Sequence, residues 1–421
     1  MKIAIFSDCY LDLTGGITTS ITAEKAELEK RGHTVYIFSS AYPRSKQEAR
    51  KLASKNIFPV PSCRFFMRGL TPISRCPKAV MHWCEKNFPE LKNFDIFYIH
   101  YEAGCSIAGL KLAKKYKRPA IQVMHGREDM GETNIIPLGL RTAAAYVLSL
   151  LHSYYIPHKI QILKDDYLAD SLAKAKMWSL MVNHANFADL VITPSKHFAE
   201  KLIHYGVTRK IVPLPNGIDD ELFLPDLKPR ILKSNEPLKI IWHSRVSAEK
   251  RIMPFLHALT KVNGKYRLDV YGGGGDFFRA KRFARHHKIN VIFHGNTNFG
   301  TVYKAITKSH LDVLVSDNFD TFGMTLIEAE SVGVPTLIAD PDLTETVPKG
   351  GYVLARSSSP DDMATAISEL ISHPEHIEKM SKILLKNRDS AKISRKVDKL
   401  EQMFNSRTLK AYEPSERRAR P

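Results

Sequence analysis

The stretch that decides the fold of this chain reads Asp320-Thr-Phe-Gly-Met-Thr-Leu-Ile-Glu328 and continues Ala-Glu-Ser-Val-Gly-Val-Pro-Thr-Leu-Ile-Ala-Asp340. The apolar run 311–316 before it predicts a buried parallel strand that ends in a polar loop. Residues 322–332 have helical spacing, Gly333 ends the helix, and 336–339 is the next apolar run. The stretch therefore predicts a strand–loop–helix–strand unit.

The start of the predicted helix has the features of a phosphate-binding site. Gly323 lets a ligand approach the backbone closely, and the free N–H groups of the first helical turn can bind phosphate. Asp320 lies in the loop and Glu328 lies on the helix behind it. Two carboxylates placed in this way can accept hydrogen bonds from sugar hydroxyls while the N–H groups hold a diphosphate. An ordinary sheet–helix unit with solvated carboxylates is the alternative interpretation.

This pattern resembles the donor-site motif of the retaining glycosyltransferases of family 4: Asp320, seven further residues and Glu328, with Phe-Gly between them and Gly-Val-Pro after them. The resemblance implies the GT-B architecture, an α/β fold in which two Rossmann-like, doubly wound parallel-sheet domains face each other across a cleft. It implies catalytic roles for Asp320 and Glu328. It also implies donor contacts at the helix start, which comprises Phe322, Gly323, Met324 and Thr325. The family usually has Glu where this chain has Asp320, so the identity of the donor sugar stays open.

The bulk composition indicates a soluble globular chain with an unusual charge. Its 421 residues suggest two domains, and 43% hydrophobic and 25% charged residues are ordinary values. The net charge of +18 favours anionic partners, which could be nucleic acid, anionic lipid surfaces or phosphate-bearing substrates. Five cysteines without a Cys-x-x-Cys pair indicate reduced thiols and no structural zinc. No apolar run reaches the ~18–20 residues that span a bilayer, so we expect a cytoplasmic protein. Peripheral contact with the inner face of the cell membrane is left open.

Residues 1–215 are predicted to form the first domain, which binds the acceptor in the resembled family. A strand at 2–7 leads to Gly15-Gly16, which opens a helix. The region lacks the full Gly-x-Gly-x-x-Gly fingerprint, which disfavours nicotinamide or flavin binding. The resemblance implies that Gly15 and Gly16 face the donor diphosphate, and a plain strand-to-helix turn is the alternative. The strand 120–124 ends in His125, which the resemblance places beside the transferred sugar in a catalytic role.

Two segments of the first domain have two possible interpretations: they contact a membrane, or they only cover the core of the domain. Residues 63–78 interleave aromatic and basic side chains, as interfacial segments do. The predicted helical insertion at about 137–184 mixes leucines and tyrosines with basic residues. It resembles either a helical flap on the acceptor side or a membrane-facing amphipathic element. The alternative for both segments is that their apolar side chains point into the core.

The second domain is predicted at 216–390, opening at the turn Asn216-Gly217. A strand at 238–243 is followed by Arg245, and Lys250 comes five residues later. The resemblance implies that these two cations grip the donor diphosphate, where negative charge grows as the nucleotide leaves. It also implies that His294 and Asn296 contact the donor beside the nucleotide base. A last helix at 391–406 is expected to pack back on the first domain, and the tail 407–421 to be disordered.

Taken together, the resemblance implies a hexosyltransferase that retains anomeric configuration and uses a nucleotide sugar, expected to be a UDP-sugar. It needs neither a metal nor the paired carboxylates of a glycosidase. The expected acceptor is a membrane lipid such as diacylglycerol or a lipid-linked glycan. An envelope polysaccharide or soluble acceptor and a sugar-nucleotide epimerase are the alternatives. Nucleic-acid binding is suggested by charge alone, because no recognition motif is present. Donor sugar and base, acceptor, linkage and oligomeric state stay open at this point.

Overall fold

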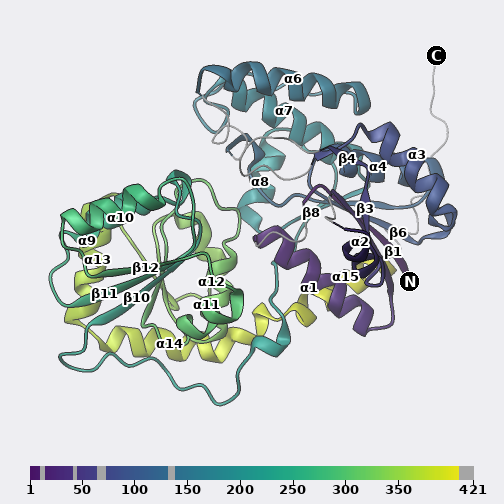
Figure 1. The fold of residues 1–421 in the computed structure, drawn as a ribbon. Helices are drawn as coiled ribbons and strands as arrows, with labels where there is room; N and C mark the ends of the chain where they lie inside the picture. The colour runs from purple at the N-terminus through teal and green to yellow at the C-terminus, as the bar shows by residue number, and fades with distance from the viewer. Residues whose placement is uncertain (10–14, 41–44, 64–72, 131–137, 407–421) are drawn as a thin grey trace. The chain divides into compact units, whose positions relative to one another are not determined.

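The structure is a computed structural model that describes residues 1–9, 15–40, 45–63, 73–130 and 138–406. The chain divides into two compact units (Figure 1). The first comprises Met1–Leu214 together with the chain from Lys396 onward, and the second comprises Pro215–Arg395. Most of the predicted aromatic–basic segment, the start of the predicted insertion and the predicted tail lie outside the described residues.

The first unit is built on a parallel sheet with strand order β3-β2-β1-β6-β7-β8-β9. Its central strand pairs on both sides, since Ile5 lies opposite Ile37 on one neighbour and Tyr98 on the other. The inner strands are buried on both faces, so they read as continuous apolar runs. The strands are β1 (Lys2–Ser7), β2 (Thr34–Ser40), β3 (Ile57–Val60), β6 (Ile96–His100), β7 (Ala120–Val123), β8 (Leu190–Thr193) and β9 (Ile211–Pro213), and β4 (Ser62–Cys63) with β5 (Ile73–Ser74) forms a short antiparallel ladder.

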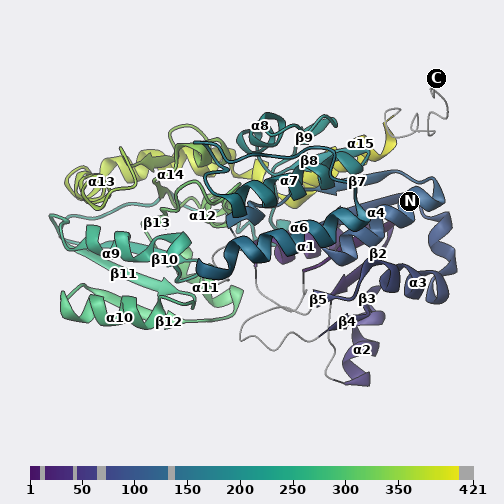
Figure 2. The same ribbon diagram turned by 90° about the horizontal axis from the view of Figure 1, so that it is seen from above.

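Helices cover both faces of this sheet (Figure 2). The helices of the unit are α1 (Gly16–Lys30), α2 (Lys46–Ala53), α3 (Pro77–Asn87), α4 (Gly104–Tyr116), α6 (Arg141–Tyr155), α7 (Leu172–Phe187), α8 (Lys196–His204) and α15 (Ile393–Asn405). The last helix joins the first unit through ion pairs. Lys396 contacts Glu24 at 2.6 Å in the interior, and Arg31 contacts Asp398 at 2.7 Å and Glu401 at 2.8 Å.

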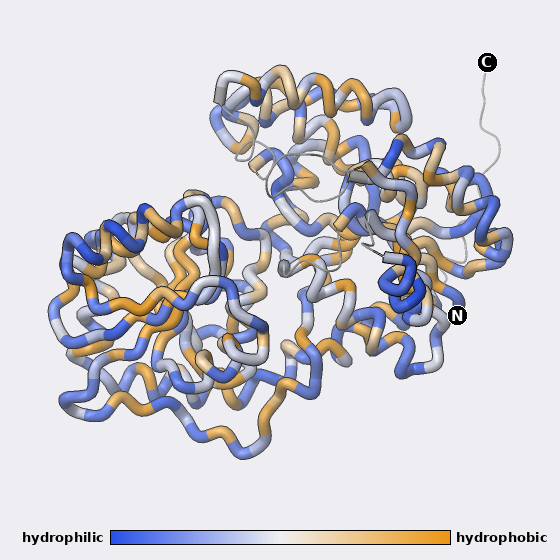
Figure 3. Tube along the Cα trace, in the orientation of Figure 1, coloured by the Kyte–Doolittle hydropathy of each residue, from blue (hydrophilic) through white to orange (hydrophobic). Residues whose placement is uncertain are grey.

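The second unit repeats the same plan with strand order β12-β11-β10-β13-β14-β15. Its strands are coloured as apolar along most of their length in Figure 3, and they form the core with the helices around them. The strands are β10 (Leu238–His243), β11 (Tyr266–Tyr271), β12 (Val291–Gly295), β13 (Leu311–Leu314), β14 (Thr336–Ile338) and β15 (Tyr352–Leu354). The helices are α9 (Ile252–Leu259), α10 (Phe277–His286), α11 (Phe299–Ile306), α12 (Met324–Ser331), α13 (Pro360–Ser372) and α14 (Glu375–Asn387).

In both sheets the chain starts in the middle, winds to one edge and then returns to build the other side. The strand order reverses between β1 and β6 in the first unit and between β10 and β13 in the second. The prediction of two doubly wound parallel-sheet domains is therefore confirmed. Open sheets of this kind bind ligands at the carboxyl ends of the strands beside such a reversal.

The insertion predicted to be mostly helical contains the two helices α6 and α7. Residues 156–171 between α6 and α7 are not helical, and α7 alone lies in the core. None of the helices in the described ranges combines the length and the apolar character needed to cross a bilayer.

Candidate active site

The loops that follow β10 and β13 meet at the strand reversal of the second sheet, and an ion pair joins them. The Lys250 Nζ lies 2.6 Å from Asp320 Oδ1 and 2.8 Å from Oδ2. The Ser316 hydroxyl also donates a hydrogen bond to Asp320. The structure thus brings together two residues that the sequence placed in one site, although they are 70 positions apart. Asp320 thus accepts from both Lys250 and Ser316, and its two oxygens keep further acceptor capacity for another donor.

Arg245 lies near the same pair. Its guanidinium lies 5.9 Å from the ring centre of Phe319, and the Lys250 Nζ lies 5.4 Å from the same ring. The arginine side chain is 63% exposed and contacts Glu249 at 3.2 Å, whereas Lys250 is only 12% exposed. Phe319 therefore holds two cations side by side, one anchored and one able to move toward an anion.

The start of α12 can bind an anion. Gly323 precedes the helix with φ +76°, and a Cβ there would lie 2.6 Å from Leu314 Cδ2. Among the described residues, no side chain caps this end of the helix, and its first turn has no acidic residue. The hydroxyl of Thr325 is buried without a hydrogen-bond partner in the described structure. The N–H groups of Met324 and Thr325 and the helix dipole thus present positive potential, as the sequence analysis predicted for a phosphate.

Glu328 is held by a buried histidine that the sequence analysis did not assign. His243, the last residue of β10, lies 3.3 Å from Glu328 through Nδ1 and 3.0 Å from Asp312 through Nε2. Burial alone would lower the pKa of His243, but the two carboxylates raise it to about 10. The imidazole is therefore charged at neutral pH and fixes the Glu328 carboxylate on the inner side of α12. The sequence signals were a histidine closing an apolar strand and an aspartate inside the run Leu311–Leu314.

A glycine-rich turn supports the loop after β10. Gly272 has φ +127°, and a Cβ there would lie 2.3 Å from the Ser244 carbonyl oxygen. The Val246 N–H donates to the Gly273 carbonyl at 2.9 Å, and the Asp276 N–H donates to the Val246 carbonyl at 3.0 Å. Close backbone packing, rather than chain flexibility, thus requires glycine here. The turn holds the loop that carries Arg245 and Lys250.

The two residues predicted beside the nucleotide base lie in different surroundings. The Asn296 side chain lies 2.9 Å from the position of a Cβ on Gly273, so it borders the glycine-rich turn. The ring of His294 stacks on Tyr271 with centroids 4.2 Å apart, and its Nε2 lies 2.8 Å from Asp269. His294 is thus engaged by neighbours on strand β11, while Asn296 lies at the loop.

The predicted site residues of the first unit follow β1 and β7. Gly15 is the residue before α1, and a Cβ on it would meet no heavy atom of the described residues within 4 Å. Gly16 is the first residue of that helix. The buried His125 has its Nε2 2.8 Å from Nδ1 of His100, and burial holds the pKa of both rings below the ordinary value. His125 is therefore a neutral imidazole with one ring nitrogen engaged by His100.

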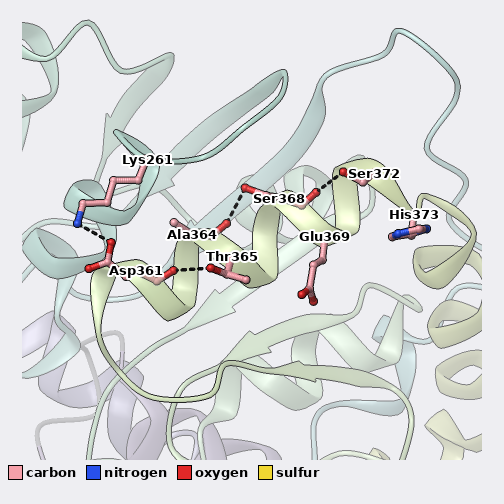
Figure 4. A pocket seen from close by; sticks show the side chains of 8 residues that line it. All are labelled: Lys261, Asp361, Ala364, Thr365, Ser368, Glu369, Ser372 and His373. Atoms are coloured by element: carbon pink, nitrogen blue, oxygen red, sulfur yellow. Dashed lines mark hydrogen bonds and ion pairs between the residues drawn. The ribbon is translucent and has the colours of Figure 1, made fainter.

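A shallow pocket elsewhere in the second unit includes none of these residues. Lys261 and one side of α13 line it, and several of its polar groups bond to one another (Figure 4). Lys261 pairs with Asp361 at 2.6 Å, and Ser368 donates to the Ala364 carbonyl at 2.7 Å. The part of the chain that the structure describes contains no group of three His, Cys, Asp or Glu residues that could hold a metal ion. The hydrogen-bond donors at the strand reversal, which are the Lys250 ammonium and the N–H groups at the start of α12, suit a phosphate group instead.

Known protein families and structures are similar to nearly the whole chain. A family model described as "Glycosyltransferase Family 4" matches residues 14–222, and one described as "Glycosyl transferases group 1" matches residues 225–403. An α-monoglucosyldiacylglycerol synthase from Acholeplasma laidlawii is 23% identical over 91% of each chain. The enzyme of the same name from Streptococcus pneumoniae is 26% identical over 80% of this chain and 70% of its own. The crystal structure of Anabaena HepE in complex with UDP has the same fold, with a TM-score of 0.67, 14% identity and coverage of 96% of this chain and 99% of that one.

Proposed function

The chain belongs to the family-4 glycosyltransferases, and we propose that it transfers a hexose from a UDP-sugar to the hydroxyl of a membrane lipid, with diacylglycerol as the first candidate. The predicted GT-B fold class and the predicted dependence on a nucleotide sugar are confirmed. The names of two relatives that align with most of the chain support the lipid acceptor. The UDP bound to a protein of the same fold supports uracil as the base of the nucleotide donor.

One observation carries the proposal: at the strand reversal, Lys250 from the loop after β10 pairs with Asp320 in the loop that leads into the start of α12. Lys250 and Arg245 would neutralise the donor diphosphate, and the N–H groups from Gly323 to Thr325 would bind its oxygens. These groups supply fixed positive charge where the leaving phosphate becomes more anionic, so the proposal requires no metal.

The carboxylates would orient the rest of the donor. Glu328, held by His243 at 3.3 Å, would accept hydrogen bonds from the ribose hydroxyls. Asp320 would accept from the donor sugar once the diphosphate competes for Lys250. Phe322 and Asn296 would border the donor. The roles predicted for His125, Gly15 and Gly16 in the first unit stay predictions.

The proposed reaction retains the configuration of the sugar. Attack and departure would occur on the same face, with an oxygen of the leaving phosphate taking the proton of the acceptor hydroxyl. No enzyme nucleophile is then required, so carboxylates at glycosidase spacing are not needed. The α-glucosyl product in the names of the relatives fits retention from an α-linked nucleotide sugar.

Two successive measurements test this function. Thermal-shift screening against UDP, GDP, ADP and their sugars identifies the donor, because a ligand at about 100 times its Kd adds about 2.7 kcal/mol of stability. The stabilising sugar is then supplied with diacylglycerol in detergent micelles, and the anomeric configuration of the product is read by NMR. We expect UDP to stabilise and an α-glycolipid to form.

Other results would replace the proposal with its alternatives. Transfer to a soluble or polysaccharide acceptor but not to diacylglycerol would refute the lipid acceptor. Conversion of the free nucleotide sugar without any acceptor would indicate an epimerase. Absence of stabilisation by every nucleotide would contradict the donor site itself.

A further inference from the structure

Helix α6 turns most of its large apolar side chains to the solvent, whereas Leu148 and Tyr155 pack inward. Its buried positions are Ala145, Ser149 and His152, which are small or polar. The exposed large side chains on the same helix are Tyr146, Val147, Leu150, Leu151 and Tyr154, of which Leu150 is 71% and Tyr154 70% exposed. In most surface helices of soluble proteins the apolar stripe faces the core, whereas most large apolar side chains of α6 face the solvent.

The buried face of α6 is anchored, so the helix cannot roll its apolar face inward. His152 bonds to His158 at 2.7 Å and to His184 at 3.0 Å, and His184 bonds to Gln122 of strand β7 at 3.0 Å. Ala145 packs against α7 in a small apolar cluster. Burial holds the pKa of His152 and of His184 below the ordinary value, so this chain of imidazoles is neutral near pH 7.

The exposed side chains form one outward face. Val147, Leu150, Leu151 and Tyr154 follow the spacing of a single helical stripe, and Leu140 just before the helix is also 61% exposed. Figures 1 and 2 show α6 on the outside of the first unit, with α7 on its inner side. Large apolar side chains exposed together along one stripe mark a binding surface rather than an ordinary solvated face.

The charged residues of α6 and of the segment that follows it up to residue 164 are all basic. The sequence from 138 to 164 contains no Asp or Glu, but it contains Arg141, Lys159 and Lys164. Two further lysines contact the stripe itself. The Lys78 Nζ donates to the Tyr154 hydroxyl at 3.1 Å, and the Lys176 Nζ lies 4.9 Å from the ring centre of Tyr146. Each of these tyrosines thus pairs an apolar ring with a cation, the combination that suits the headgroup level of a bilayer.

We propose that the outward face of α6 docks this protein on a bilayer that contains anionic lipid. The helix lies in the plane of the interface, with Leu150 and Leu151 among the acyl chains and Lys78 and Lys176 at the level of the phosphates. If a second copy of this chain covered the stripe, the lysines of the two copies would face and repel each other. An anionic bilayer, in contrast, complements both the apolar stripe and its positive charges. This inference rests on the proposed function, since docking would place the acceptor-binding unit on the leaflet that contains a lipid acceptor.

Vesicle flotation tests the proposal with the full-length protein. We expect the wild type to float with vesicles of phosphatidylcholine and phosphatidylglycerol and to partition less onto phosphatidylcholine alone. The variant Leu150→Glu/Leu151→Glu should lose about tenfold in partitioning for each leucine no longer buried in the bilayer. Lys78→Gln should lose about fivefold, and only on the anionic vesicles. The matched control is Ile203→Glu on α8, where an apolar residue is 57% exposed outside α6, and it should float as the wild type does.

Three results would overturn the docking surface. They are a wild type that stays unbound to anionic vesicles, a double variant that floats like the wild type, and a wild-type dimer that the double variant dissociates. The double variant must keep the wild-type melting temperature, and Leu150→Ala supplies a milder change if it does not.

Activity in detergent micelles separates this inference from the proposed function. Micellar transfer to diacylglycerol with no flotation would refute the docking surface and leave the function standing. Flotation through α6 with no transfer to any lipid would refute the function and leave the docking surface standing.

Discussion

Replacing His243 with glutamine tests the buried contact that holds Glu328. The imidazole lies between Asp312 at 3.0 Å and Glu328 at 3.3 Å, and its side chain is 2% exposed. Removing one partner of a buried ion pair leaves the remaining charge without compensation and costs about 3–5 kcal/mol. For a unit of this size each kcal/mol shifts the melting temperature by about 2–4 °C, so His243→Gln should melt about 10 °C lower near pH 6.5.

The pH dependence of this difference follows from the raised pKa of His243. The folded value is about 10 and the ordinary value is 6.5. The unfolded chain loses its proton first as the pH rises. The contribution of His243 to the free energy of unfolding is therefore complete below pH 6.5 and disappears as the pH rises through 10, at up to about 1.4 kcal/mol per pH unit. The gap between wild type and variant should narrow from pH 6.5 to pH 10.

Urea unfolding of both proteins, followed by tryptophan fluorescence in a Trp83→Phe/Trp178→Phe background that leaves only Trp242 beside the substituted residue, measures this gap. The matched control is His310→Gln, because burial lowers the pKa of His310 and no cation is lost with it. Its effect should be small and constant above pH 7. A gap for His243→Gln below 1 kcal/mol at pH 6.5, or one that widens with rising pH, would refute the charged imidazole.

Three further predictions concern the same unit. Lys250→Ala and Glu328→Ala should each lower kcat/KM for the nucleotide sugar by roughly 100-fold, about 2.7 kcal/mol, and a value within a few-fold of the wild type would exclude that residue from the site. Burial raises the pKa of Glu330 to about 8 from the ordinary 4.5, so its carboxyl destabilises the fold increasingly as the pH rises between these values. Glu330→Gln should then match the wild type in urea unfolding at pH 4.5 and exceed it in stability at pH 8.5, and equal curves at both pH values would contradict the buried neutral carboxyl. Gly272→Ala should lower the melting temperature by several degrees because its Cβ would lie 2.3 Å from the Ser244 carbonyl oxygen, whereas Gly275→Ala, with open space around it, should melt like the wild type.

The sequence determined the fold class and the location of the candidate site. Buried parallel strands read as apolar runs, so the runs around 311–316 and 336–339 predicted β13 and β14, and the pattern between them predicted α12. The glycine before that helix marked the backbone position that a ligand could approach. These signals are local, because burial and backbone hydrogen bonding impose their periodicity on a few consecutive residues.

Only the tertiary structure decided which side chains meet. The contact of Lys250 with Asp320 and the contacts of His243 with Asp312 and Glu328 join loops and strands distant in the sequence. Strand order brings them together, and a short-range pattern does not encode strand order. For the same reason, the sequence left both interpretations of the 137–184 insertion open.

In that insertion, α7 belongs to the core while α6 presents its apolar side chains to solvent. The sequence of α6 alone did not determine which face of the helix packs against the rest of the unit. That was decided by the anchoring of His152 against His184, a contact between two helices that exists only once the unit has folded.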